Sequence, residues 1–303
     1  MLLKYGVRIF KYLLSPRGPE HLCSRHKLRY PGRTQRDYFG GNKMTGLNFS
    51  ANLSFLFTEH KTYAERFQAA AAAGFKGVEI NFPYTESVED LKNGAILDVV
   101  LMNTYPGEGG QLGFAAIPGK EKEFADSVRA AFVYVDALQV PRLHIMSGVV
   151  QGENRAECYE TLEKNLRSIL PDLEKRNVVG VIEPINNDTV PGYFLNNYNE
   201  ALELVKKIDS PFLQLQIDIF HLQKIQGNLT KFLRAAIPVT AHIQIAQVPH
   251  RHEPPSVGEI NYDYIFGLLN NELNYKNWIG LEYHPEKGTA AGLDWVSKYS
   301  TKI

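Results

Sequence analysis

Short apolar runs alternate with longer amphipathic segments along most of the chain, beginning near Leu47. The apolar runs are rich in β-branched residues and lack clean apolar–polar alternation, which is typical of strands buried on both faces. The segments between them place apolar residues three and four positions apart, which predicts helices that bury one face. Eight such runs occur, at residues 47–52, 76–82, 97–103, 142–148, 178–186, 213–221, 239–249 and 277–285.

The regular alternation of strand and helix predicts an α/β fold with a parallel sheet. Eight units within residues 44–303 match the usual size of a closed (β/α)8 TIM barrel, so we predict one such domain, each strand being followed by a helix. A doubly wound open sheet is the alternative, but it usually carries a glycine-rich phosphate turn after its first strand, and none follows residues 47–52. The glycine-rich stretch 107–113 has Leu112 where a third glycine would be required, and we interpret it as a mobile loop over one end of the barrel.

The first 43 residues have a different character from the rest of the chain. They contain ten basic and two acidic residues, and their opening 14 residues have the pattern of a basic amphipathic helix, ended by Pro16. Three interpretations remain open: a mitochondrial-type presequence, an alternative start upstream of Met44, and a helix that lies on a membrane surface. Charges interrupt the apolar residues, so a secretory signal is excluded, and a cytoplasmic or mitochondrial location is expected.

Composition excludes several classes of protein. The chain has 33 basic and 33 acidic residues, so residues 44–303 carry 23 basic and 31 acidic ones, and an acidic body does not favour nucleic acid. The two cysteines, Cys23 and Cys158, have no paired spacing, which excludes a disulfide framework and a zinc–thiolate site. No run of 18 apolar residues is present, so no membrane span is expected. A small-molecule substrate is the expected partner, and a homo-oligomer stays open.

Four polar residues stand at equivalent places in the last four predicted strands. Glu183, Asp218, Gln244 and Glu282 each follow Ile or Leu directly, and their separations of 35, 26 and 38 residues each correspond to about one strand–helix unit. Parallel strands of a barrel point the same way, so these side chains should converge at the carboxyl-terminal mouth, where barrel active sites lie. Glu79 occupies a similar place in the second predicted strand.

A divalent cation would resolve the repulsion between three carboxylates in a buried mouth. Two glutamates, one aspartate and one amide oxygen form an all-oxygen set, which suits Mg²⁺ or Mn²⁺ best. Zn²⁺ and Co²⁺ remain alternatives, because carboxylates bind them too. We interpret Glu79 as a hydrogen-bond partner behind the ligands rather than as a fifth ligand.

At these residues the chain resembles the hydroxypyruvate isomerase family of the xylose-isomerase-like TIM barrel superfamily. The resemblance implies metal ligation by Glu183, Asp218, Gln244 and Glu282, with the two glutamates moving the proton. Two departures affect it: only 13 residues, 84–96, separate the second and third strands, and the loop HRHEPPSVGEINY differs in length and in His252. The matching stretches are FSANLSFLF, GFKGVEINFPY, IPGKEKEF, IEPIN, QIDIFHLQKIQGNLT, HIQIAQVPHR, GEINYDYIF and WIGLEY.

The implied reaction interconverts hydroxypyruvate and tartronate semialdehyde through an enediolate, which requires a base, an acid and a positive centre. Arg251 is the candidate for binding the substrate carboxylate, since a guanidinium can do so with two hydrogen bonds. His221 could hydrogen-bond a substrate oxygen, and His250 and Glu253 are further candidates for substrate contact from the Arg251 loop. Residues expected to lie behind the site or in the core are His144 and His242.

Two rival functions remain open at this point. A ketose 3-epimerase or a sugar-acid dehydratase would share the barrel and the metal site, but would return the proton elsewhere. A metal-binding barrel that has lost catalysis is the rival from another class. Because the same barrel serves many reactions, turnover of hydroxypyruvate against tagatose or fructose would separate these functions.

Overall fold

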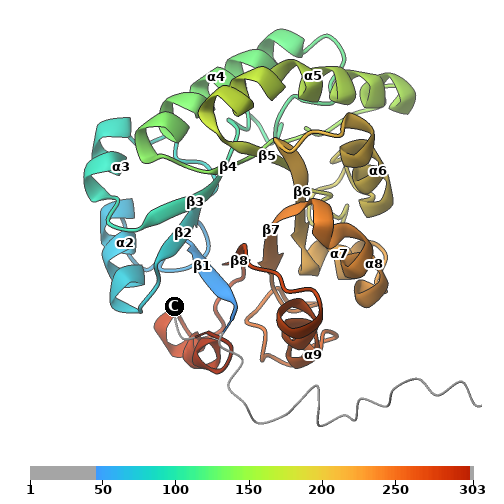
Figure 1. Ribbon diagram of the computed structural model, residues 1–303. Coiled ribbons are helices and arrows are strands. Elements are labelled where there is room, and N and C mark those ends of the chain that lie inside the picture. Colours follow the sequence, from blue (N-terminus) through green and yellow to red (C-terminus); the bar gives the residue numbers. More distant parts are fainter. Residues whose placement is uncertain (1–45, 301–303) are drawn as a thin grey trace, which may run out of the picture.

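The computed structural model describes residues 46–300, which form a closed barrel of eight parallel strands in sequence order (Figure 1). The predicted (β/α)8 TIM barrel is therefore confirmed, and each strand lies within one of the eight predicted runs. The segment 1–43 and its three interpretations lie outside the described residues. The strands are β1 (Asn48–Asn52), β2 (Gly77–Ile80), β3 (Asp98–Asn103), β4 (Arg142–His144), β5 (Val179–Ile182), β6 (Leu213–Asp218), β7 (Thr240–Ile245) and β8 (Trp278–Leu281).

Helices surround the barrel on its outside, as Figure 1 shows. Their apolar faces pack inward on the strands; α4, for example, buries Phe124, Val128 and Val135. Several begin at side chains that accept backbone N–H groups, as Asn154 does for α5, which satisfies donors left free at a helix start. The α-helices are α2 (Tyr63–Ala72), α3 (Val88–Gly94), α4 (Glu121–Leu138), α5 (Arg155–Arg176), α6 (Tyr198–Ile208), α7 (Ile219–Ile225), α8 (Leu229–Ala236) and α9 (Tyr262–Gly267).

Two units differ from the regular pattern. The short segment 84–96 forms only the seven-residue helix α3, and Tyr134 of α4 donates a hydrogen bond to the Glu86 carbonyl just before it. After β8 the chain forms two 3₁₀ segments, η3 (Ala290–Gly292) and η4 (Asp294–Lys298), where we predicted an α-helix. Glycines at 288 and 292 lower the helix propensity of that stretch, which accounts for the difference.

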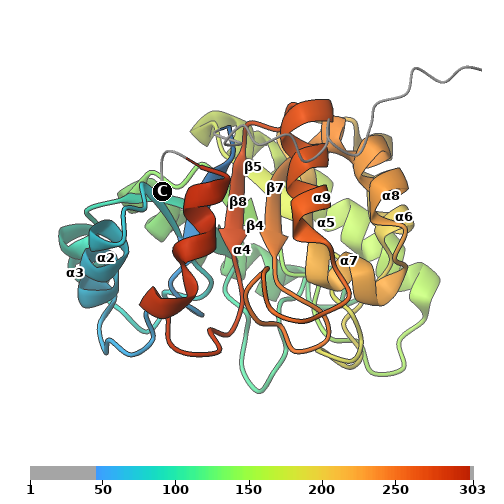
Figure 2. The same ribbon diagram turned by 90° about the horizontal axis from the view of Figure 1, so that it is seen from below.

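The barrel interior changes from apolar to polar along its axis. Leu101, Val181 and Ala241 of β3, β5 and β7 pack together in a small apolar cluster, as side chains of alternate strands do in such barrels. Toward the carboxyl ends the buried side chains become polar, and Figure 2 shows that the arrows of β7 and β8 point to the face with the longer loops. No helix within residues 46–300 has the length and apolarity to cross a membrane.

Candidate active site

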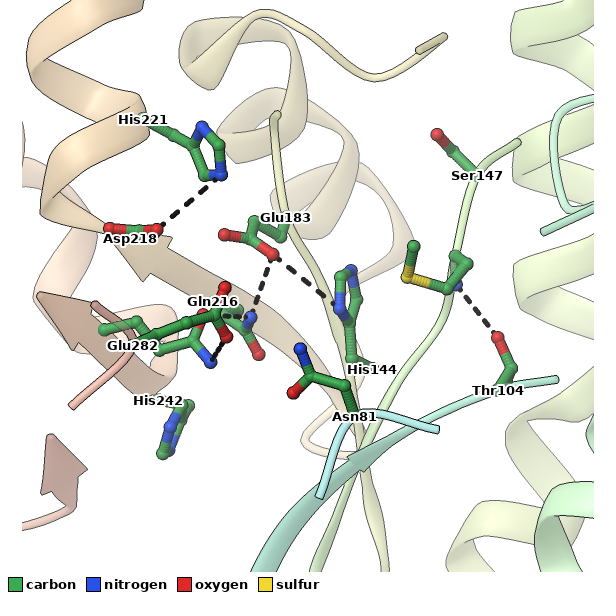
Figure 3. Close-up of polar contacts among 12 residues, drawn as sticks. Asn81, Thr104, His144, Ser147, Glu183, Gln216, Asp218, His221, His242 and Glu282 are labelled. Carbon is green, nitrogen blue, oxygen red and sulfur yellow. Dashed lines mark hydrogen bonds and ion pairs between the residues drawn. The ribbon is translucent and has the colours of Figure 1, made fainter. Parts of the chain in front are cut away.

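The four predicted ligand residues all lie at the carboxyl ends of their strands. Asp218 is the last residue of β6, Gln244 lies near the end of β7, and Glu183 and Glu282 directly follow β5 and β8. All four are buried, with at most 8% of their surface exposed. Figure 3 shows Glu183, Asp218 and Glu282 directed toward a common space, so the structure brings the predicted group together.

Hydrogen bonds connect three of the four residues: Gln216 links Glu183 to Gln244, and Gln244 bonds Glu282 directly. Gln216 Nε2 donates to Glu183 Oε2 over 2.9 Å and to Gln244 Oε1 over 2.8 Å. Gln244 Nε2 in turn donates to Glu282 Oε2 over 2.7 Å. Gln216 was not among the site residues predicted from the sequence, although the alternation in LQLQID places it on the same strand face as Asp218 and could have identified it.

Arg251 lies among the carboxylates at the mouth of the barrel. Its Nη2 is 2.6 Å from Glu282 Oε1 and 3.4 Å from Asp218 Oδ2. The rings of Phe55 and Phe220 both lie against it, each with its centroid 5.0 Å from the guanidinium carbon. Among the hydrogen bonds of residues 46–300, none involves the buried Arg251 Nε, so this donor remains free for a ligand.

His221 lies beside Asp218, and its ring orientation is set by Asn186. The backbone N–H of Asn186 donates to His221 Nδ1 over 3.3 Å, which places the proton of the neutral ring on Nε2. That nitrogen is 3.6 Å from Asp218 Oδ2. Burial, and then the nearby positive charge of Arg251, lower the pKa of His221 well below its ordinary value, so the ring is neutral and offers Nε2–H as a donor.

His144 borders the site from the end of β4. Its Nδ1 is 3.7 Å from Glu183 Oε2, and Figure 3 shows the ring beside that carboxylate. Burial, reinforced by His242, lowers the pKa of His144 to about 3, so this ring is neutral as well. The expected position behind the ligands therefore agrees with the geometry for His144.

Two of the predicted substrate contacts lie apart from this group. Both carboxylate oxygens of Glu253 accept the backbone N–H of Glu286, at 3.1 Å each, and a Cβ at Gly292 would meet Glu253 Oε1 at 2.3 Å. These contacts give Glu253 a part in holding the loop after β8. His250 is exposed, with its ring 5.9 Å from that of His252.

The pKa values of all three carboxyl groups of the site are raised. Burial raises the pKa of Glu183 well above its ordinary value, and the charges of Asp218 and Glu282 raise it further. Burial likewise raises the pKa of Asp218 to about 6 and that of Glu282 to about 8, although Arg251 opposes both shifts. A cation bound among them would reverse this tendency, because it stabilises the charged carboxylates.

The donor set fits a divalent cation that prefers oxygen ligands. Oxygens of Glu183 and Asp218 lie with a His221 nitrogen within 4.8 Å of one another. The buried Glu183 Oε1 has no hydrogen-bond partner in the part of the chain that the structure describes, so it is available as a ligand. His221 Nε2 carries a proton and is therefore a hydrogen-bond donor in this arrangement rather than a ligand.

A parallel barrel with carboxylates gathered at its carboxyl-terminal mouth defines this molecule as a TIM-barrel protein with a candidate cation site. The family model described as xylose isomerase-like TIM barrel matches residues 67–299. The chain belongs to this family, which confirms the resemblance seen in the sequence.

Relatives and a solved structure are similar over most of the chain. A putative hydroxypyruvate isomerase of Danio rerio is 44% identical, covering 84% of this chain and 96% of the relative. A 2-oxo-tetronate isomerase of Cupriavidus necator is 39% identical, covering 83% and 98%. The crystal structure of a protein from Brucella melitensis, described as AP endonuclease, family 2, is 40% identical with a TM-score of 0.79, covering 84% and 99%.

Proposed function

We propose that the chain is a divalent-cation-dependent isomerase that interconverts hydroxypyruvate and tartronate semialdehyde (2-hydroxy-3-oxopropanoate). One observation carries the proposal: two buried glutamates, Glu183 and Glu282, enter the mouth from β5 and β8, and Arg251 lies at the same site with an Nε that has no hydrogen-bond partner in the described part of the chain. Such a site offers two groups that exchange protons and one that binds an anion. Relatives named as isomerases of 2-oxo acids support this choice.

The cation would be held by Glu183, Asp218, Gln244 and Glu282. Their oxygens suit Mg²⁺ or Mn²⁺ best, with Zn²⁺ and Co²⁺ as alternatives. When bound, the ion supplies positive charge that stabilises the negative oxygens of an enediolate. The buried Glu183 Oε1, which has no partner among residues 46–300, supports this assignment.

The reaction moves one proton between neighbouring carbons of a three-carbon acid. One glutamate, in its ionised form, removes a proton from C3 of hydroxypyruvate, and the C2–C3 enediolate forms. The other glutamate, in its protonated form, delivers a proton to C2. The C3 hydroxyl proton passes to the C2 oxygen, so the C3 oxygen becomes the aldehyde and the C2 oxygen becomes the hydroxyl, and the two glutamates regain their starting protonation by exchange with water. The burial of Glu183 and Glu282 at the carboxyl ends of β5 and β8, beside the same candidate cation site, supports this pairing.

Arg251 and His221 would bind the substrate. The guanidinium would offer its Nε–H to the substrate carboxylate. The rings of Phe55 and Phe220, which pack against the guanidinium, would restrict its orientation. His221 Nε2–H would donate to a substrate oxygen beside Asp218. Glu253 and His250, the two other candidates from the sequence, have no part in this proposal because of their contacts and exposure.

A longer 2-oxo acid is the second candidate substrate. The relative named 2-oxo-tetronate isomerase favours it, and a 2-oxo-tetronate would present its carboxylate to Arg251 in the same way. An uncharged ketose, the substrate of a 3-epimerase, lacks the carboxylate for which the free Arg251 Nε is suited.

The test is a measurement of metal content in the purified protein, followed by turnover assays. Hydroxypyruvate, 2-oxo-tetronate and tagatose should be compared before chelation, after chelation, and after Mn²⁺ or Mg²⁺ is added back. We expect turnover of the 2-oxo acids that chelation abolishes and the cation restores. Turnover of tagatose alone, or turnover that survives complete removal of metal, would contradict the proposal.

A further inference from the structure

The amide of Gln244 has two ends of nearly the same shape and opposite chemistry. Its oxygen can bind a cation, while its NH₂ group only donates hydrogen bonds and would repel one. Gln244 therefore serves as a ligand only if its neighbours fix which end faces the cation. The residues around it decide this orientation.

Glu79 contacts the nitrogen end of that amide. Gln244 Nε2 donates to Glu79 Oε2 and to Glu282 Oε2, at 2.7 Å each. An ionised carboxylate only accepts hydrogen bonds, so the NH₂ group is the end that can face Glu79. The amide oxygen then lies on the other side, where it accepts the Gln216 N–H that also reaches Glu183.

The carboxylate of Glu79 is itself held in one place by hydrogen bonds. It is fully buried, and its Oε1 accepts hydrogen bonds from Ser50 Oγ at 2.7 Å and His242 Nε2 at 2.8 Å. Its Oε2 accepts a further hydrogen bond from Asn52 Nδ2 at 3.3 Å, so donors surround both oxygens of the carboxylate.

A glycine in β8 leaves space for the Glu79 carboxylate. A Cβ at Gly280 of β8 would lie 1.9 Å from Glu79 Oε1, so a side chain at position 280 is incompatible with this carboxylate. Figure 3 shows His242 and Asp218 on opposite sides of Gln216. Glu79 thus acts on the site through Gln244.

We infer that Glu79 is a positioning residue that turns the oxygen of Gln244 toward the cation. The inference rests on the proposed cation site and adds the residue that sets its geometry. Interactions of this kind behind a ligand typically change metal affinity by about 10- to 100-fold. A purely structural role for Glu79 would instead change folding stability without a selective change in metal affinity.

The test measures Mn²⁺ affinity by calorimetry and the thermal midpoint of each variant. In Glu79→Gln, the new amide can present either end to Gln244, so we expect Mn²⁺ affinity to fall by about 10- to 100-fold. Ser50→Ala is the matched control, because Ser50 bonds the same carboxylate from an equally buried position without contacting Gln244. Its Mn²⁺ affinity should stay close to that of the wild type.

A double variant that exchanges the side chains of positions 79 and 244 separates the orientation of residue 244 from the loss of the Glu79 charge. Gln244→Glu alone sets a carboxylate directly against Glu79, which lies behind the ligands, so the cation does not neutralise this repulsion. The new side chain should turn away from Glu79, and the variant should bind Mn²⁺ poorly. The double variant Glu79→Gln/Gln244→Glu keeps the number of carboxylates, and its residue 244 presents oxygen from either end. The double variant should therefore bind Mn²⁺ more tightly than either single variant.

Three results would overturn the inference. The first is wild-type Mn²⁺ affinity in Glu79→Gln. The second is a double variant that binds Mn²⁺ no better than Gln244→Glu does, and this comparison remains decisive if Glu79→Gln fails to fold. The third is a wild-type protein that binds no Mn²⁺, and this result refutes the proposed cation site itself. The first two leave that site standing, so the two failures are distinguishable.

Discussion

Arg251 provides the sharpest test of substrate charge. Its Nη2 is already bound to Glu282 and Asp218, while the buried Nε has no hydrogen-bond partner among residues 46–300, so a substrate carboxylate would gain at least one charge-assisted hydrogen bond there. Such a bond contributes about 1.5–3 kcal/mol, which corresponds to a factor of about 10–150 in binding. We therefore expect Arg251→Ala to raise the KM for hydroxypyruvate by about that factor.

The assay compares hydroxypyruvate with dihydroxyacetone, in which a neutral CH₂OH group replaces the carboxylate. KM, or a competitive inhibition constant, should rise strongly for the acid and little for the neutral compound. Arg251→Lys keeps the charge but loses the planar fork, so its KM should fall between those of wild type and Arg251→Ala. His250→Ala is the matched control, since this exposed neighbour has its ring against His252 and should leave both constants unchanged. Equal effects of Arg251→Ala on both compounds would refute the carboxylate role.

Two further predictions concern stability. The raised pKa values of Glu183 and Glu282 mean that these groups hold more protons in the folded, metal-free protein than in the unfolded chain. Between about pH 6.5 and 8 the buried His144 and His221, whose pKa values are lowered in the fold, no longer oppose this trend, so the free energy of unfolding should fall as pH rises through that window. Urea unfolding with chelator at several pH values tests this: saturating Mn²⁺ should flatten the dependence, and metal-free stability that rises with pH would contradict it. Glu253→Gln should lower stability by about 1.5–3 kcal/mol, since an NH₂ group replaces one acceptor of the Glu286 N–H. The KM for hydroxypyruvate should stay unchanged, and an increase would return Glu253 to the substrate site.

The sequence was sufficient to predict the barrel and the position of its polar residues. Apolar runs mark buried strands, and a residue that directly follows Ile or Leu at a strand end, such as Asp218, has its location fixed by the parallel arrangement. Gln216 was accessible by the same reasoning, because it lies two positions before Asp218 and shares its face of the strand. The approach of these side chains to one another follows directly from barrel closure.

Contacts between segments far apart in the chain could not be predicted from the sequence. The hydrogen bond between Gln244 and Glu79 spans 165 positions, and its direction depends on the buried charge of Glu79 and the space at Gly280. Periodicity places each of these residues on a strand but does not show which atom faces which. Glu253 shows the converse: its place in the Arg251 loop suggested substrate contact, while its carboxylate binds the backbone of a separate loop.

The central claim is that Glu183 and Glu282 both bind the cation and transfer the proton. Its most direct test is kcat for hydroxypyruvate at saturating Mn²⁺ in Glu183→Gln and Glu282→Gln, with Mn²⁺ affinity measured on the same samples. An amide oxygen can still coordinate but cannot act as a base, so Mn²⁺ affinity should fall moderately while kcat falls by about 10²- to 10⁴-fold in each variant. A kcat near the wild-type value in both variants, with Mn²⁺ bound, would contradict the account.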